Sequence, residues 1–397
     1  MKNEQALAGR QIFPNLLGFR FWMANTIIYG HLEETKYLRH LFVSLDHVKR
    51  THSIGFYPVL MFFTMSGFLI TYQLEVEKYN SGNVNIKKFY RNRIFRIWPL
   101  FYLSMFIYWI VLPYSFMGDY YNTIFFKPWP GFEDATMLFE IPKWILFTMS
   151  FLLMPHIAYI IELLNVRIWI YGVHHWTIGV EEIFYIFWPL AWRKMERFKS
   201  FIIKCFALYY VALAVCAMVF VIYKKVYPTA HFKYFTFLLT YIVLFTHAYC
   251  FFIGATAIYM LLHRKDLVQK YITGKLAIVC MVIMFGLMLS GFEFPFFINE
   301  IFCTAFAIFM LYLVKDGKKY AILEHPFIVY LGKITYSVYL FHFMAIVVVM
   351  YFLERYNVQQ HGELVFDLLQ YPLTWLLTFG FSALTHEYFE KKILAYR

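Results

Sequence analysis

The sequence predicts an all-α fold, a polytopic membrane bundle of about ten transmembrane helices with one further re-entrant or interfacial segment. Of its 397 residues, 61% are hydrophobic and only 15% are charged, whereas an average soluble domain has roughly 25% charged residues. The apolar residues form runs that approach the ~20 residues a helix needs to cross the hydrocarbon core. These runs and their short connections occupy residues 1–397, which we interpret as a single domain, and they exclude a soluble enzyme.

Ten apolar runs are predicted to cross the membrane. In chain order they lie at 12–31, 54–74, 97–113, 176–192, 201–223, 235–262, 275–291, 295–314, 327–352 and 371–390. An eleventh run at 143–162 is ambiguous. The basic stretch at 193–204 lies on the cytoplasmic side, as Lys- and Arg-rich loops do, only if this run does not cross. We therefore expect 143–162 to be re-entrant or to lie on the surface, and both termini to be cytoplasmic.

The net charge of +12 does not indicate nucleic acid as a partner, because Lys and Arg are distributed between apolar runs rather than gathered in one patch. The five cysteines lie inside apolar segments and form no C-x-x-C pair, so neither a disulfide framework nor a zinc site is expected. His174 and His175 have no third ligand at helical spacing, so no metal is predicted.

The first run carries two ionisable side chains, Arg20 and His31, and such residues inside a span indicate a functional site by default. They are eleven residues apart, which on an α-helix is about 16 Å along the axis and about 20° beyond three full turns. Both side chains therefore project from one face. The alternative is an arginine that extends to the interface and an interfacial histidine.

The fourth run begins at Trp176 and carries two adjacent carboxylates, Glu181 and Glu182, inside an apolar helix. Glu181 and Tyr185 share a helix face by their i, i+4 spacing. A structural role for Glu181 as the partner of Arg20 is the alternative to a catalytic one, and the two are compatible.

A basic segment precedes the third run. It contains Lys87, Lys88, Arg91, Arg93 and Arg96. Arg93 and Arg96 are one turn apart and can face one anion, and guanidinium groups bind phosphate bidentately. A phosphorylated cytoplasmic donor is therefore predicted, with simple positive-inside sorting as the alternative. In the second run, Ser66 and Gly67 do not form a nucleophile elbow, and Gly67 is expected to permit close helix packing.

These motifs, in this order, resemble the acyltransferase-3 family of integral membrane O-acyltransferases, which acylate bacterial surface carbohydrates and some small molecules. The resemblance rests on R-x10-H (Arg20, His31), FF-x-x-SGFLI (with Ser66 and Gly67), R-x-x-R (Arg93, Arg96), W-[ST]-x-x-VE-x-x-FY (Trp176, Glu181, Tyr185), YS-x-YL-x-H (Tyr336, Ser337, His342) and a closing element that ends at Glu390. Thr177 and Thr335 stand where the family commonly has Ser.

The resemblance implies the stand-alone type of the family, without a fused hydrolase-like domain, in a bacterial cytoplasmic (inner) membrane. It implies transfer of an acyl group, most simply acetyl from acetyl-CoA, to a hydroxyl of an extracytoplasmic carbohydrate such as O-antigen or exopolysaccharide. The acceptor is then a carbohydrate or a lipid-linked glycan, and membrane lipid surrounds the bundle. The stand-alone type is compatible with a homo-oligomer or with a separate extracytoplasmic partner.

Roles for the motif residues follow from this resemblance. His31 is the expected general base. Arg20 would stabilise charge on the thioester oxygen or hold the donor, and Glu181 would orient His31 or balance Arg20. Arg93 and Arg96, aided by Lys87, Lys88 and Arg91, would bind the phosphates of CoA. No role for His342 follows from the sequence.

The alternative function is a transporter or flippase of lipid-linked sugars. It is disfavoured because the chain shows no internal duplication and no paired Gly/Pro-broken helices in two halves. A scaffold subunit would not explain Arg20, His31 and Glu181 in apolar helices. The sequence does not determine the acceptor, the acyl chain length or the oligomeric state. It also does not determine whether an acyl-enzyme forms.

Overall fold

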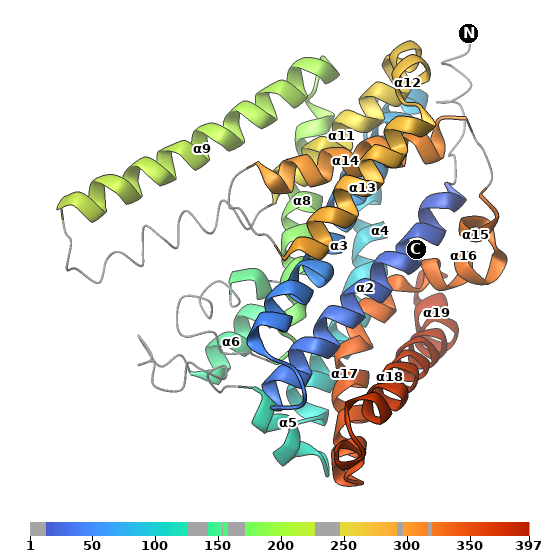
Figure 1. Ribbon diagram of the computed structural model, residues 1–397. Helices are drawn as coiled ribbons and strands as arrows, with labels where there is room; N and C mark the ends of the chain where they lie inside the picture. The colour runs from blue at the N-terminus through green and yellow to red at the C-terminus, as the bar shows by residue number, and fades with distance from the viewer. Residues whose placement is uncertain are drawn as a thin grey trace.

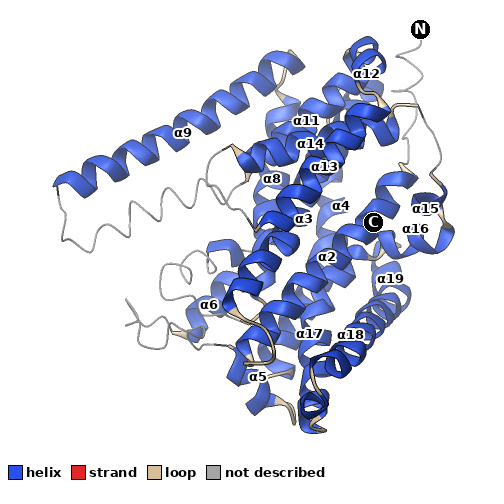
Figure 2. Cartoon of the chain, viewed as in Figure 1, coloured by secondary structure: helices blue, strands red, loops and turns tan. Residues whose placement is uncertain are grey.

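The computed structural model describes residues 13–125, 142–152, 154–157, 171–226, 247–291, 297–316 and 320–396. Within these ranges every regular element is a helix and none is a strand (Figure 2). The helices pack side by side as one bundle, and α9 (Phe198–Val226) projects away from it (Figure 1). The predicted all-α polytopic class is confirmed.

Each of the ten predicted runs contains a helix. Besides α9 these are α2 (Pro14–Leu38), α3 (Leu45–Ser81), α4 (Ile86–Phe106), α8 (Trp176–Arg193), α11 (Ala248–His263), α13 (Gly274–Ser290), α14 (Ile298–Val314), α17 (Thr335–Arg355) and α18 (Glu363–Thr385). The first part of the run at 235–262 and part of that at 295–314 lie outside the described residues.

The criteria of helix length and apolarity identify fewer membrane-crossing helices than the ten predicted from the sequence. Among the described residues, five helices are long and apolar enough to cross a membrane, or six if α12 (Lys265–Tyr271) and α13, bent by 78°, form one span. The first helix, α2, also carries Arg20, Glu33, Glu34 and Lys36, and charged side chains are costly in hydrocarbon. Its polar contacts, described below, explain how such a helix is accommodated in the bundle.

The segment at 143–162 contains α6 (Lys143–Phe151), whose nine residues extend only about 14 Å, too short to cross. The ring of Tyr171, just before α8, lies 5.0 Å from that of Tyr121 in α5 (Gly118–Ile124). The chain therefore enters α8 from the end of the bundle at which α4 and α5 finish. This agrees with a segment that does not cross, although Leu153 and residues 158–162 lie outside the described part.

Two glycines let α3 and α11 pack with their backbones in contact. A Cβ added to Gly67 would lie 2.3 Å from the carbonyl oxygen of Phe251, and one added to Gly254 would lie 2.0 Å from that of Thr64. No real Cβ occupies such a position, so each site requires glycine. The role in close packing predicted for Gly67 is confirmed. Small residues commonly allow membrane helices to approach each other closely.

We predict that Gly67→Ala lowers the free energy of unfolding by about 1–3 kcal/mol or more, because the added methyl group forces the two backbones apart. Thermal unfolding of purified protein in detergent measures the change. Gly380→Ala is the matched control, because a Cβ there meets nothing within 4 Å. Equal thermal stability of the two variants would contradict the packing account.

Candidate active site

Five helices surround a cavity of about 420 Å³ in the interior of the bundle. Its polar lining comes from α2 (Arg20), α3 (Ser66, Gln73, Glu77), α4 (Lys88, Asn92, Arg93, Arg96), α8 (Glu181, Glu182, Tyr185) and α17 (Tyr336). Glu77 and Lys88 are close to the α3–α4 turn, so the cavity extends toward that end of the bundle. The structure thus brings together residues from five motifs that the sequence predicts as one site.

Three arginines and Lys88 bring positive charge to this cavity, against the three carboxylates of Glu77, Glu181 and Glu182. The guanidinium of Arg20 lies 5.6 Å from the ring centre of Phe62. Arg93 donates a hydrogen bond to Gln73 Oε1 at 3.1 Å and its guanidinium lies 5.1 Å from the ring centre of Tyr185. Arg96 lines the cavity one turn further along α4. An aromatic face supports a guanidinium without neutralising it, so this lining can bind an anion.

Glu181 is held in the cavity wall by two hydroxyl groups. Ser66 Oγ donates to its Oε1 and the Tyr185 hydroxyl donates to its Oε2, each at 2.8 Å. The contact with Tyr185 agrees with the predicted i, i+4 face. Of the two roles expected for Glu181, the geometry favours charge balance for Arg20, which lines the same cavity, whereas His31 does not belong to the cavity lining.

A second polar cluster, formed by histidines, lies toward the other end of the bundle. The His31 and His342 ring centres are 5.2 Å apart, and those of His342 and His174 are 4.9 Å apart. His342 is fully buried and its Nδ1 donates to the carbonyl of Tyr339 at 2.7 Å. Its Nε2 has no hydrogen-bond partner among the described residues. His342, unassigned from the sequence, therefore lies directly beside the predicted base.

The cavity ends before it reaches His31. Tyr336 lines the cavity, and His342 lies six residues, about 9 Å, further along α17. Between them, the Tyr339 hydroxyl accepts a hydrogen bond from Thr177 at 2.6 Å and donates to the backbone carbonyl of His174. These contacts join α8 to α17 between the cationic cavity and the histidine cluster.

His31 contacts a carboxylate that the sequence analysis did not single out. Its Nδ1 lies 2.9 Å from Glu34 Oε2, and Nδ1 of His52 lies 2.9 Å from Glu34 Oε1. The i, i+3 spacing of His31 and Glu34 on a helix could have predicted this contact from the sequence. The partnership with His52 joins α2 to α3 and had no signal in the sequence.

The remaining predicted residues divide between lining and packing. Lys87, Lys88 and Arg91 are all exposed, and of the three only Lys88 lines the cavity. The Trp176 ring packs 5.6 Å from His247. Ser337 is hydrogen-bonded to Thr385 of α18 at 2.6 Å. In the described part of the chain, no group of three His, Cys, Asp or Glu side chains could hold a metal ion.

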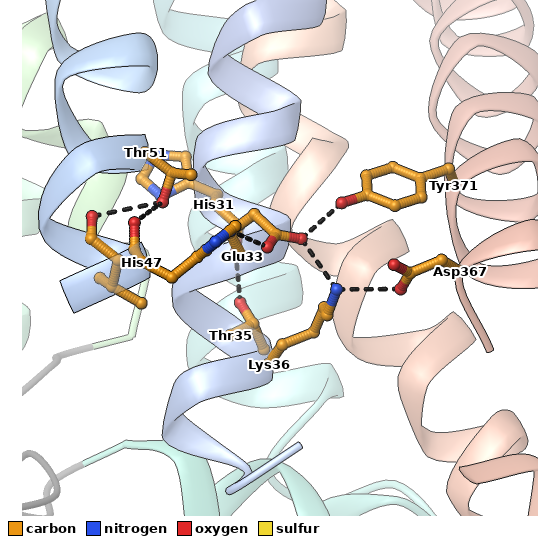
Figure 3. A network of polar contacts seen from close by, with 9 residues as sticks. His31, Glu33, Thr35, Lys36, His47, Thr51, Asp367 and Tyr371 are labelled. Atoms are coloured by element: carbon orange, nitrogen blue, oxygen red, sulfur yellow. Dashed lines mark hydrogen bonds and ion pairs between the residues drawn. The ribbon is translucent and has the colours of Figure 1, made fainter. Parts of the chain in front are cut away.

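A buried ion network lies next to His31 (Figure 3). Lys36 Nζ is 3.0 Å from Glu33 Oε1 and 2.9 Å from Asp367 Oδ1, and its side chain is only 1% exposed. Tyr371 donates to Glu33, and His47 Nε2 lies 2.6 Å from Glu33 Oε2. Figure 3 shows Asp367 and Tyr371 of α18 pointing toward Lys36 and Glu33. The network ties α2 to α3 and α18.

A family model described as an acyltransferase domain matches residues 15–387. The chain belongs to the acyltransferase-3 family. The match includes all the motif residues named above except Glu390, which lies just beyond it. No curated protein and no solved structure matches the chain.

Membership of the acyltransferase-3 family, together with the apolar helices, makes the chain an integral membrane acyltransferase. Acyl transfer requires a group that removes a proton from the acceptor and charges that hold the donor or stabilise its carbonyl oxygen. In this acyltransferase-3 protein the histidine cluster can supply the group that removes the proton. The cationic cavity can supply the charges that hold the donor.

We predict that Lys36→Met lowers the free energy of unfolding by about 3–5 kcal/mol, because Glu33 and Asp367 are left without their buried cation. Thermal unfolding in detergent is the measurement. Lys391→Met is the control, since its ion pair with Glu387 is solvent-exposed and exposed pairs contribute little to stability. A Lys36→Met protein as stable as the Lys391→Met protein would show that the network does not hold the helices together.

Proposed function

We propose that the protein transfers an acyl group, most simply acetyl, from cytoplasmic acyl-CoA to a hydroxyl of an extracytoplasmic carbohydrate such as O-antigen or exopolysaccharide. The observation that carries the proposal is that one cavity is lined by Arg20, Lys88, Arg93 and Arg96, while His31 lies on the same helix as Arg20, toward the opposite end. In this proposal the protein lies in a bacterial inner membrane, as the family resemblance implies, and both termini are cytoplasmic, as the distribution of Lys and Arg predicts.

The cationic end of the cavity suits the phosphate groups of CoA. Arg93 and Arg96 are one turn apart, and each can bind phosphate bidentately, while Lys88 adds a third positive charge at the α3–α4 end. Exposed Lys87 and Arg91 would contribute attraction at longer range. The volume, about 420 Å³, lies within the usual range for small-molecule sites. It accommodates part of an acyl-CoA. For the narrow pantetheine arm to extend toward His31, the hydrogen bonds of Tyr339 with Thr177 and His174 have to open.

The chemistry is an acyl transfer from sulfur to oxygen. His31 Nε2 accepts the proton of the acceptor hydroxyl while that oxygen attacks the thioester carbonyl carbon. Arg20 holds the donor, because it lies about 16 Å from His31 along α2, too far to contact the oxygen of the reacting carbonyl. The C–S bond then breaks, the ester is released, and the proton on His31 passes to the sulfur to give the free thiol of CoA.

The acceptor would be a carbohydrate or a lipid-linked glycan. A homo-oligomer and a separate extracytoplasmic partner are both compatible with this proposal. The alternative function, a transporter or flippase of lipid-linked sugars, receives no support from the family match, which covers nearly the whole chain.

We predict that His31→Ala abolishes acyl transfer without lowering protein abundance, because the base is lost while the side chain is partly exposed and its removal leaves no large cavity. Release of free thiol from acetyl-CoA is measured in membranes of the native host, which carry the native acceptor. Retained turnover would remove His31 from the chemistry.

We predict that the double variant Arg93→Ala, Arg96→Ala binds acetyl-CoA at least tenfold more weakly, because a hydrogen bond to a charged group contributes about 1.5–3 kcal/mol. Calorimetry or equilibrium dialysis with purified protein measures the dissociation constant. Arg193→Ala with Arg197→Ala is the matched control, since it removes two exposed charges that do not line the cavity. If both double variants weaken acetyl-CoA binding equally, the loss of affinity results from the change in net charge and not from the cavity arginines.

We predict that surface glycan from cells lacking the gene loses mass corresponding to one acyl group per modified unit. Mass spectrometry of the purified glycan, with and without the gene, identifies both the acyl chain and the acceptor. An unchanged glycan mass would exclude this acceptor class.

A further inference from the structure

We propose that Glu34 is the positioning residue for His31 and that His52 holds the other oxygen of the same carboxylate. The inference rests on the proposed function, in which His31 removes the proton of the acceptor hydroxyl. It goes beyond that function by assigning two residues that the family motifs quoted above do not include. The three side chains form a bridge, His31–Glu34–His52, with both hydrogen bonds at 2.9 Å.

The first step of the argument concerns the tautomer of His31. An ionised carboxylate only accepts hydrogen bonds, so the contact of Glu34 Oε2 with Nδ1 of His31 places the proton of the neutral ring on Nδ1. The lone pair is then on Nε2. The second nitrogen is thereby prepared to accept the proton of the acceptor, as in other sites where a carboxylate fixes a catalytic imidazole.

The second step compares Glu34 with its neighbour in sequence. Glu33 has a buried cation, Lys36, at 3.0 Å. The ion pairs of Glu34 within the described ranges are with His31 and His52, and its side chain is 8% exposed. Two neutral imidazoles leave a buried carboxylate without a compensating charge. The imidazolium formed when His31 takes a proton supplies that charge, so Glu34 stabilises the state that the reaction creates.

The third step is the rigidity of the bridge. His31 is on α2 and His52 is on α3, and the backbones of the two helices lie close together beside them. A Cβ added to Gly30 would lie 2.8 Å from the Cα of Gly55. Close backbone contact next to the bridge fixes the distance between the two rings, and the carboxylate between them is fixed from both sides. Such preorganisation limits the motion of the base during the reaction.

The bridge leaves the proton balance of the reaction unchanged. The acceptor proton moves to His31 Nε2, and the proton on Nδ1 stays in its hydrogen bond with Glu34. When the C–S bond breaks, the proton on Nε2 passes to the sulfur of CoA. Glu34 neither gains nor loses a proton over the cycle, and it acts only through His31.

The test compares Glu34→Gln with the wild type in native-host membranes, with acetyl-CoA as the donor. The neutral amide removes the charge and permits the wrong tautomer, so kcat per folded molecule should fall about 10²- to 10⁴-fold while the dissociation constant of acetyl-CoA stays unchanged. Glu34→Asp should recover part of the rate. His52→Gln should cost less, about 3- to 10-fold, because one hydrogen bond to the carboxylate is lost.

The matched control is His47→Gln. His47 is also on α3, is about as exposed as His52 (46% against 41%), and also contacts a glutamate of α2, in its case Glu33. Its substitution should leave kcat unchanged. A fall in kcat for His47→Gln equal to that for His52→Gln would show that any loss of an α2–α3 contact slows the enzyme, and would overturn the proposal.

A double variant separates positioning from an independent structural effect. If Glu34 acts through His31, the residual rate above background in His31→Ala does not fall further when Glu34→Gln is added. Additive losses, or an unchanged kcat in Glu34→Gln, would overturn this inference. If instead His31→Ala retains the full rate, His31 is not the general base. That result contradicts the proposed function itself and is distinct from a failure of the Glu34 inference.

Discussion

The cost of placing charge inside an apolar bundle is the constraint on which the rest of this structure depends. An ionisable side chain at membrane depth is destabilising unless it lies in a polar cavity or has a partner. Arg20, Arg93, Arg96 and Glu181 meet this requirement by lining one cavity, and Glu33 and Lys36 meet it by pairing with each other and with α18. The polar groups of the described chain are therefore concentrated in a few places, while helices such as α9 present apolar side chains outward.

This concentration separates two kinds of polar cluster along the bundle. The cationic cavity can bind an anionic donor, and the histidine cluster can move a proton. Tyr339 of α17 and Thr177 of α8 form the contact between them, so the two clusters lie at different depths of one bundle, and α2 carries a residue of each, Arg20 and His31. A membrane acyltransferase that takes its donor from one side and its acceptor from the other requires such a division.

Much of this organisation could be predicted from the sequence because it is local or periodic. The apolar runs located the helices, and the i, i+4 spacing of Glu181 and Tyr185 predicted a contact that the structure contains. Gly67 was expected to pack closely and does so. Arg20 was expected to act with His31, and the arginines of α4 to bind the donor; the structure places the three arginines in one cavity whose lining does not include His31.

The rest depends on contacts between helices, whose depth relative to each other has no periodic signal. Glu34 can contact both His31 and His52 only at one axial position of α2 relative to α3. The close approach of Gly30 and Gly55 fixes that position. The proximity of His31, His174 and His342 depends on three helices at once. The cavity that Arg20 lines does not reach His31, because it ends where Tyr339 joins α17 to α8.

The most direct test of the account is an electron cryo-microscopy structure of the protein with acetyl-CoA bound. We expect the phosphates within hydrogen-bonding distance of Arg93 and Arg96, with the pantetheine arm passing Arg20 and the Ser66–Glu181 pair and the thioester directed toward His31. Acetyl-CoA bound elsewhere on the protein, with the arginine-lined cavity occupied by lipid or closed by side chains, would contradict the account.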